Sequence, residues 1–486
     1  MRTFPEELKL LLKSRKISAS VAALELGYSS KTALLRILNG KSKPSSYRKC
    51  FDAILASPII ALTHEERMNL QRALQISTMG PQEYALNSSL QNLLYPQKID
   101  DRPQDIPLSG LEEMTTVEEL ITRVSAFRGL EISLFGKCPP ELLARLSRFA
   151  QTADVSSITH IIAVQRNNAD DFISVGETSH IIFNERYSLF IYIERVEITT
   201  WAFHSGMIFF TGEDSAGKKH TYFIAPLPSS GYYAVYDRNG SILQFKDRIL
   251  QESEPFIFPI KRTRNYNRHP FPINYINFTT EYRKIENNRE IYTIKPDIPF
   301  YSISPDLLYP IILEAFSSID PFIKTNPSVP ELYEIQKARY ENLLHKSKVS
   351  HFVLKQSAME DFARTGRLQD HLFILRPFTP QERVAILSAI ANAMTENPMF
   401  NIWFSRYPYL FADMEVTAYE THSLAIIDAK TSWNLHSSHQ EILLEGKALS
   451  SSFRNLVNQL VSDGSVFPRE ESLRILRDLI EIAANA

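Results

Sequence analysis

The segment 18–44 constrains the fold most, because two short stretches of helical spacing follow one another in it and glycine closes each. Small and apolar residues predict one buried stripe per helix: Ala22, Ala23 and Leu26 in the first, and Leu34, Ile37 and Leu38 in the second. Gly27 should end the first helix and Asn39-Gly40 the second, because glycine takes the left-handed conformation without steric cost. Two short helices joined by a tight turn are therefore predicted.

Hydroxyl side chains stand where each of these helices should begin. Either Ser18 or Ser20 is expected to cap the first helix, which runs from about Ser20 to Leu26, and either Ser29 or Ser30 the second. Pro44 is expected to keep the chain from resuming a helix at once.

This pattern resembles the helix-turn-helix of the Cro/repressor-like (XRE) class of DNA-binding domains. The matching features are Ala23 four positions before Gly27, the triplet Leu34, Ile37 and Leu38, and the closing Asn39-Gly40 followed by lysine and proline. The stretch Gly27–Gly40 is one residue longer than the usual pattern, and we place the extra residue in the turn at 28–30. The resemblance covers about residues 1–75 and implies a helical domain that places its second motif helix in the major groove of DNA.

The face of the second helix opposite its buried stripe should meet DNA, and Leu35 is expected to lie on this outer face. We predict base contacts from Ser30, Lys31, Thr32 and Arg36. We predict phosphate contacts from Ser20, Asn39, Lys41, Lys43 and Arg48. One recognition helix gives little specificity, so a homodimer on pseudo-palindromic double-stranded DNA is expected.

The charge distribution favours the same interpretation. Residues 1–50 carry eleven Lys and Arg against three Glu, a net charge of +8, whereas the whole chain has −2, so the other 436 residues sum to −10. A basic module on a mildly acidic body attracts phosphate while the body is kept off DNA. The alternatives are an ordinary solvated helix surface, or an interaction scaffold in which the helical domain contacts protein.

The remainder of the chain predicts further domains, because 486 residues exceed one ordinary core and the composition, 44% hydrophobic and 22% charged, is that of a globular protein. We expect a helical DNA-binding domain at 1–95, a linker at 96–110, a strand-rich α+β domain at 111–325 and a mainly helical α+β domain at 326–486. The predicted fold class is therefore multidomain, with an all-α N-terminal domain before an α+β body.

Three features of the sequence predict a cytoplasmic protein without a membrane partner. No apolar stretch approaches the roughly 20 residues that cross a bilayer, and the first residues lack the apolar core of a signal peptide. The two cysteines, Cys50 and Cys138, cannot form a disulfide framework, so both are expected to be reduced thiols.

The middle part is rich in β-branched and aromatic residues. Strands are predicted at 130–134, 158–164, 180–193, 199–211, 222–226, 232–236, 242–245 and 256–260. The sequence Asn239-Gly240 predicts a hairpin before 242–245. Aromatic residues on these strands line a ligand pocket or belong to plain core: Phe190, Tyr192, Trp201, Phe203, Phe209, Phe210, Tyr222, Tyr232, Tyr233 and Tyr236.

The last third is predicted to be mainly helical. Helices are expected at 304–318, 330–346, 380–394, 449–461 and 470–484, with short strands at 414–419 and 423–427. Capping boxes open the helix after Thr379 and an earlier one, from Thr63 to about Ile76. No internal sequence repeat is found.

The sequence contains only weak matches to motifs for nucleotide binding, metal binding or catalysis. Gly212–Lys218 has P-loop spacing, but Lys219 replaces the required hydroxyl residue and two acidic residues would repel phosphate, so a polar hairpin tip is expected. The segment 436–441, with two histidines, fits no zinc motif and is read as a polar loop before a helix. The basic cluster 261–268 either forms an exposed loop between strands or touches an anion.

We therefore predict no catalytic residue, metal or cofactor, and no enzymatic activity. The expected function is a sequence-specific transcriptional regulator whose large body senses an unknown small-molecule effector or holds the dimer together. An enzyme body fused to the DNA-binding domain is the alternative from another class.

Overall fold

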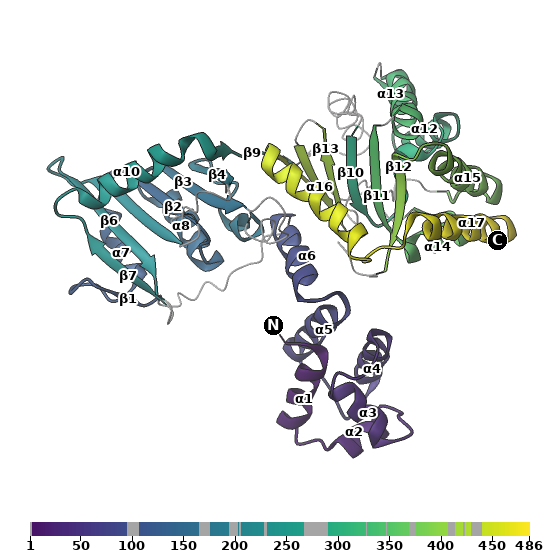
Figure 1. The fold of residues 1–486 in the computed structure, drawn as a ribbon, viewed down its shortest axis with the longest axis horizontal. Helices are drawn as coiled ribbons and strands as arrows, with labels where there is room; N and C mark the ends of the chain where they lie inside the picture. The colour runs from purple at the N-terminus through teal and green to yellow at the C-terminus, as the bar shows by residue number, and fades with distance from the viewer. Residues whose placement is uncertain are drawn as a thin grey trace. The chain divides into compact units, whose positions relative to one another are not determined.

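The computed structural model describes residues 2–94, 106–164, 175–193, 203, 206–227, 231–266, 290–326, 328–346, 348–368, 376–406, 414–420, 423–428 and 440–486. The chain divides into two compact units, of which the first consists mainly of Met1–Ser88. At a coarse level the predicted class is confirmed, because a helical N-terminal region precedes an α+β body with two mixed sheets (Figure 1).

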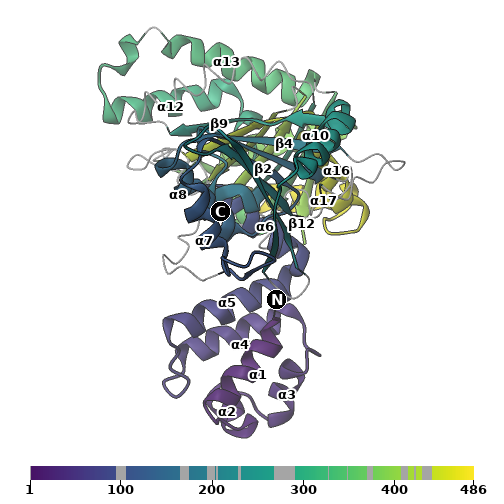
Figure 2. The same ribbon diagram turned by 90° about the vertical axis from the view of Figure 1, so that its left-hand side faces the viewer.

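The first unit is a bundle of short helices. Its helices are α1 (Phe4–Ser14), α2 (Ala19–Glu25), α3 (Lys31–Leu38), α4 (Pro44–Ala56), α5 (His64–Met79) and the start of α6 (Pro81–Leu94). Helix α5 packs against α1 and α4, and α3 packs against α1 and α2 (Figure 2). The fully buried ring of Phe4 lies 5.7 Å from Tyr47 and 6.5 Å from Phe51, so aromatic contacts join α1 to α4.

Local signals explain where two of these helices begin. The predicted capping box is confirmed at α5: Thr63 Oγ1 accepts from the Glu66 amide at 3.2 Å and the Glu66 carboxylate accepts from the Thr63 amide at 2.9 Å. The expectation for Pro44 is wrong, because Pro44 is the first residue of α4. Proline has no amide hydrogen and a helical φ, so the first helical position suits it.

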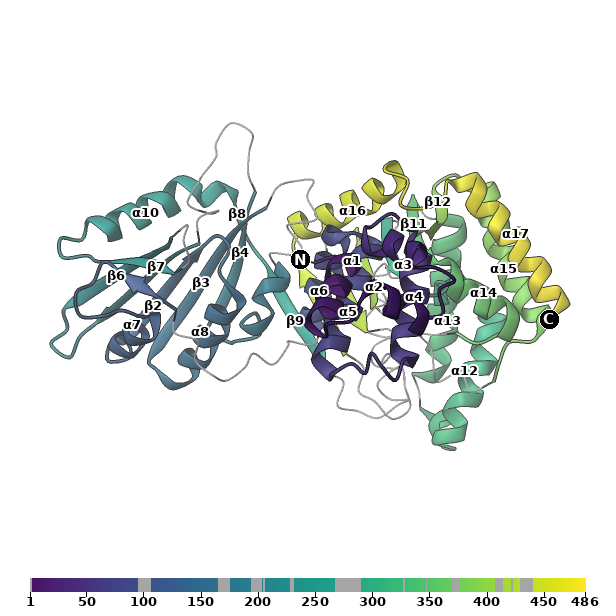
Figure 3. The ribbon, with the colours of Figure 1, turned by 90° about the horizontal axis from the view of Figure 1, so that it is seen from below.

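The first sheet has eight strands in the order β1-β7-β6-β5-β2-β3-β4-β8. Their bounds are Leu108–Ser109, Arg128–Phe135, Val155–Val164, Tyr187–Ile193, Met207–Glu213, Lys219–Pro226, Tyr232–Tyr236 and Ile257–Pro259 for β1 to β8. Strands β2, β3 and β4 are parallel, and β5, β6 and β7 form an antiparallel meander beside β2. Helices α7 (Val117–Val124) and α8 (Pro140–Thr152) lie on one side of this sheet and α10 (Ser241–Ser253) on the other (Figure 3).

The second sheet has seven strands in the order β12-β11-β10-β13-β14-β15-β9. Strands β9 to β15 span Lys261–Tyr266, Glu290–Lys295, Val349–Lys355, Phe400–Ser405, Met414–Tyr419, Ser423–Asp428 and Gln440–Glu445. The associated helices are α12 (Pro305–Ile319), α13 (Val329–Glu341), α14 (Gln356–Thr365), α15 (Pro380–Glu396), α16 (Lys447–Ser462) and α17 (Arg469–Asn485). Helix α16 contacts β10, β13, β14 and β15, whereas α15 and α17 contact β12.

The two sheets share the topology of six of their strands. In each, three parallel strands joined by crossovers (β2-β3-β4 and β10-β11-β12) are followed by a three-stranded meander that pairs with the first of them, and then by a helix, α10 or α16. A strand that precedes each set pairs with the far edge of the meander, but β1 runs parallel to β7 whereas β9 runs antiparallel to β15. The architecture is thus repeated where the sequence shows no repeat.

The predicted hairpin at Asn239-Gly240 and the predicted strand 242–245 are wrong. Gly240 has φ 74° and directly precedes helix α10. The Asp237 carboxylate accepts hydrogen bonds from the amides of Ile242 and Leu243, both at 3.0 Å, and thereby supplies the acceptor that a helix start needs. The turn therefore joins a strand to a helix.

Three further assignments change or fall partly outside the described residues. The loop reading of 261–268 is wrong for Lys261–Tyr266, which is strand β9, and the loop reading of 436–441 is wrong from Gln440, where β15 begins; 436–439 lie outside the described residues. The predicted strand 180–193 is confirmed only from Tyr187, because a 3-10 turn ends at His180 and residues 181–186 form turns.

The predicted domain boundaries remain predictions. The linker 96–110 lies outside the described residues up to 105, and its end contains β1. The second sheet draws β9 and β10 from before the expected boundary at 325 and its other strands from after it.

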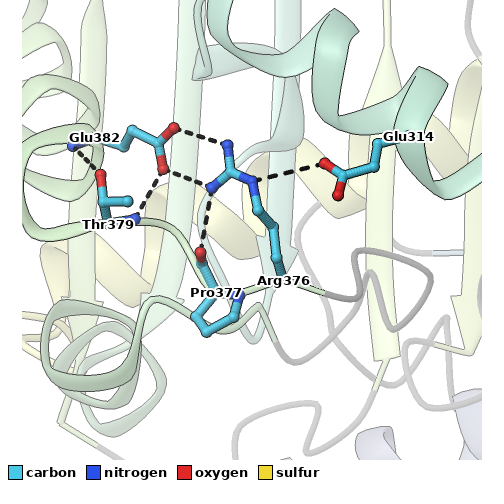
Figure 4. A network of polar contacts seen from close by, with 5 residues as sticks. All are labelled: Glu314, Arg376, Pro377, Thr379 and Glu382. Carbon is cyan, nitrogen blue, oxygen red and sulfur yellow. Dashed lines mark hydrogen bonds and ion pairs between the residues drawn. The ribbon is translucent and has the colours of Figure 1, made fainter.

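The helix and strand predictions for the last third are confirmed to within a few residues, including the capping box that opens α15. Thr379 Oγ1 accepts from the Glu382 amide at 3.3 Å, and Glu382 accepts from the Thr379 amide at 2.8 Å (Figure 4). Arg376 adds two hydrogen bonds of 2.8 Å to the two oxygens of Glu382 and lies 3.9 Å from Glu314. The start of α15 is therefore held by a charged network as well as by its cap.

Among the described helices, none combines the length and the apolar character needed to span a bilayer.

Candidate nucleic-acid interface

Helices α2 and α3 begin at serine caps. Ser18 Oγ accepts from the Val21 amide at 3.3 Å, and Ser30 Oγ accepts from the Ala33 amide at 3.4 Å. Of the alternatives left open by the sequence, Ser18 and Ser30 are thus the caps. Ser20 lies within α2 and is exposed.

Both helices end in the same hydrogen-bonded cap, with glycine in the left-handed conformation. Gly27 has φ 72°, and the amide of Tyr28 donates to the Ala23 carbonyl at 2.9 Å. Gly40 has φ 68°, and the amide of Lys41 donates to the Arg36 carbonyl at 2.8 Å. These bonds turn the chain sharply after α2 and again after α3, so each helix stays short and its direction is fixed.

The inner faces of both helices are buried as predicted. Ala22, Ala23 and Leu26 of the first stretch and Leu34, Ile37 and Leu38 of the second belong to the core of the unit. The prediction for Leu35 is wrong, because its side chain is half-buried against the same core. The buried stripe of α3 is therefore wider than its sequence spacing indicated.

The side chains predicted to contact DNA are exposed without exception: Ser20, Ser30, Lys31, Thr32, Arg36, Asn39, Lys41, Lys43 and Arg48. Helix α3 carries no acidic residue. Within the described part of the chain, no ion pair involves Lys31, Arg36, Lys41 or Lys43, whereas Arg48 pairs with Asp52 at 3.2 Å. The exposed face of α3 and the segment after it thus present cations to solvent.

The electrostatic character of the whole unit agrees with this local picture. Residues 1–88 contain thirteen Lys and Arg against seven Asp and Glu, a net charge of +6, so the remaining 398 residues sum to −8. A field of one sign over a small unit attracts polyanions from beyond contact distance.

Two exposed apolar side chains on α2 were not identified from the sequence. Val21 is 50% exposed and Leu24 is 82% exposed, whereas Ala22 and Ala23 of the same helix are buried. Their spacing of three residues, offset from the Ala22, Ala23 and Leu26 stripe, is the signal that places them on the outer face.

The motif Gly212–Lys218 lies at the turn between β5 and β6, as predicted. The Asp214 carboxylate accepts from the amides of Ala216 and Lys218, both at 2.9 Å, and its other oxygen accepts from His220 at 2.7 Å. A carboxylate therefore occupies the amides that a phosphate would need, and these bonds hold the pKa of Asp214 below its usual value.

The aromatic residues of the middle part mainly build core. Tyr192, Phe203 and Phe209 are at most 1% exposed and pack in one cluster, and Phe210 is also fully buried, whereas Tyr233 is exposed. Trp201 lies outside the described residues.

Both cysteines are free and buried, which agrees with the prediction of unpaired thiols. Burial raises the pKa of Cys50 to about 11 and that of Cys138 to about 12, so both remain protonated at neutral pH.

No protein-family model matches the chain, and no curated protein is significantly similar to it.

Proposed function

We propose that the protein is a sequence-specific DNA-binding transcriptional regulator in which α2 and α3 form a helix-turn-helix of the Cro/repressor-like type. The observation that carries the proposal is the two-sided character of α3. Its apolar stripe is buried in the unit, and its opposite face exposes Lys31, Thr32 and Arg36 on a helix that contains no acidic residue. A helix of eight residues with such a face fits the width of the major groove.

In this proposal each exposed residue has a separate role. Lys31, Thr32 and Arg36 lie on α3 and read base edges, and Ser30 reaches the same groove from the cap position. Arg36 donates two parallel hydrogen bonds to guanine O6 and N7, and a side chain with one donor could not bind both acceptors at once. Leu24 and Val21 supply apolar surface for sugars or thymine methyl groups.

The phosphate contacts come from the ends of the helices and from α4. Ser20, Asn39, Lys41, Lys43 and Arg48 hold the backbone on either side of the groove, and Arg48 exchanges its pairing with Asp52 for a phosphate. Three of these five residues are cations, so each reader releases about three counterions and contributes a slope of about −3 to log K against log[salt].

The body completes the regulator. A homodimer presents two readers to half-sites about one helical turn apart, roughly 34 Å or a multiple of it. The α+β body supplies the dimer contact, and an effector bound there changes the spacing of the readers.

Fluorescence anisotropy on a site selected from a random duplex library tests this proposal. The double variant Lys31→Ala/Arg36→Ala should weaken binding at least tenfold, since it removes about 1–3 kcal/mol of base contact per bidentate pair. The matched control is Arg67→Ala/Arg72→Ala, which removes the same charge from exposed positions on α5 and should weaken binding less than threefold.

The salt dependence separates the two kinds of contact. Replacing Lys41 and Lys43 by Ala should reduce the slope of log K against log[salt] by about 2 per reader and leave the selected sequence unchanged. Equal losses from the α3 pair and the α5 pair would contradict the proposed reading face, and binding indifferent to salt would favour a protein scaffold.

A further inference from the structure

A small cavity lies on one face of the second sheet. Its volume is about 30 Å³, and its walls come from β10, β11 and β13, from the turn after β10, and from the end of helix α13. By the same measure one water needs roughly 10–15 Å³, so the cavity holds two or three groups of that size. It can thus hold a few non-hydrogen atoms and is too small for a drug-sized ligand.

Alternate residues of β10 and β13 place charged and hydroxyl groups in this wall. Lys295 is buried, and its ammonium lies 3.3 Å from the Glu415 carboxylate. Thr417 donates to Glu415 at 3.3 Å and lies 3.0 Å from the hydroxyl of Thr293. The single carboxylate of the cavity wall is therefore already held by a cation and a hydroxyl group.

Arg339, in the last turn of α13, brings a second buried cation to the cavity. Arg339 is only 5% exposed, and its guanidinium carbon lies 4.7 Å from the centre of the Tyr301 ring. A guanidinium covered on one face by an aromatic ring keeps its donors in its own plane, which is the geometry that matches a carboxylate. The buried Tyr419 lines the same cavity, and burial raises its pKa, so its hydroxyl group stays neutral.

An irregular helix ending marks the same place. Helix α13 continues into a π-helical turn, Asn342–Lys346, and Asn342 and Leu343 line the cavity. A π-helical turn is rare, because its hydrogen-bonding pattern is less favourable than that of an α-helix, and such turns occur frequently at functional sites. This observation is independent of the charges.

We propose that this cavity binds a small organic acid, with its carboxylate at Arg339 and its short aliphatic part against Ile291, Leu343 and Phe352. The apolar side of the wall and the volume fit an acid of two or three carbon atoms, such as acetate or propionate. The proposal deepens the regulator function by giving a ligand class to the effector-sensing body. It rests on that function only for the coupling to DNA.

Calorimetric titration of the full chain with matched acids and amides tests the binding itself, without DNA. Acetate and propionate should bind saturably, with dissociation constants in the millimolar range expected for so few atoms. Acetamide and propionamide have the same shape without the charge and should bind at least tenfold more weakly, and hexanoate should bind more weakly than propionate because it exceeds the cavity. Equal binding of acids and amides, or no saturation by either acid up to about 100 mM, would overturn the proposal.

Variants assign the binding to this cavity. Arg339→Lys keeps the charge but loses the planar pair of donors, and should weaken propionate binding about tenfold. Glu415→Gln removes the negative charge of the wall and should tighten binding, a direction that simple loss of structure does not produce. The exposed Lys337→Gln on the same helix is the control and should bind as the original chain does. Unchanged affinity in both Arg339→Lys and Glu415→Gln would place the acid elsewhere and refute the site.

The DNA-binding assay tests the regulator function independently of the acid-binding assay. Acid binding without any DNA binding would remove the regulator function and leave the acid site intact. DNA binding without acid binding would refute the acid site and leave the regulator function intact.

Discussion

Acidification should destabilise the first sheet through one buried histidine, His160 on β3. The ring is 1% exposed; its Nε2 lies 2.7 Å from the carbonyl oxygen of Gly136 and its Nδ1 lies 2.7 Å from the hydroxyl oxygen of Tyr187. A carbonyl oxygen only accepts, so Nε2 carries the proton and Nδ1 accepts from the tyrosine hydroxyl. The neutral ring is fully satisfied, and a second proton would place an uncompensated charge in the core.

The structure sets the magnitude and the pH range of this effect. Burial lowers the pKa of His160 to about 4 from its ordinary value of 6.5. In the pH range between these two values the unfolded chain binds one proton more than the folded chain, so stability falls as the pH falls. At about 1.4 kcal/mol per pKa unit, the free energy of unfolding should drop by about 3 kcal/mol between pH 7 and pH 4.

Urea unfolding curves of the original chain and of His160→Gln, recorded between pH 4 and pH 8, measure this effect. The glutamine amide can donate to Gly136 and accept from Tyr187 but does not titrate. Carboxylates and the equally low-pKa His351 contribute alike to both proteins, so the difference between the two curves isolates His160. The difference should change by about 3 kcal/mol across the range, and parallel pH profiles would refute the reasoning.

Two further perturbations test local structure in the body. Gly366→Ala should cost about 2–4 kcal/mol of unfolding free energy, because Gly366 has φ 71° and an added Cβ would lie 2.8 Å from the Phe378 amide nitrogen. The control Gly464→Ala, at φ 76° with open space around it, should cost only about 1 kcal/mol. Equal losses of stability in thermal melting would contradict the steric argument. Arg376→Ala should cost about 1 kcal/mol and raise the pKa of Glu382, which its hydrogen bonds hold below the usual value; an unchanged carboxyl titration in NMR would show that the pair is not formed in solution.

Local signals predicted the parts of the fold whose cause is local. The hydroxyl residues at 63 and 379, each followed three positions later by glutamate, predicted helix starts that the structure confirms, because a capping box is complete within four residues. The glycines at 27 and 40 likewise predicted the ends of α2 and α3. The exposed face of α3 then followed from helical spacing.

Non-local pairing explains most of the errors. The basic composition of Lys261–Tyr266 predicted a loop, but the segment is the edge strand β9. Edge strands tolerate lysine and arginine because one side of the strand is unpaired. Strands β10, β11 and β12 were not identified, since their pairing partners lie far away in sequence. Strand β15 was not identified either; it pairs with its neighbour β14 on one side and with the distant β9 on the other. The prediction at Asn239-Gly240 is wrong because the Asp237 carboxylate accepts hydrogen bonds from the first amides of α10, so a helix and not a strand follows the glycine.

The proposed acid-binding cavity could not be predicted from the sequence, because its residues also come together through non-local pairing. Lys295, Arg339 and Glu415 are separated by more than forty residues in sequence and meet only because β10 pairs with β13 and α13 ends over them. By contrast, the predicted DNA-contacting residues lie within thirty positions of one another, so their common exposure was accessible from periodicity and charge.

The central claim is that the exposed face of α3 reads base edges. The most direct test selects duplex sites in parallel with the original chain and with Arg36→Ala. The original chain should enrich a two-fold symmetric site. The variant should enrich the same site but lose preference, by about 1–3 kcal/mol, at one base pair in each half. Identical base preferences from both proteins would remove Arg36 from the reading face, and no enrichment by the original chain would contradict sequence-specific DNA binding altogether.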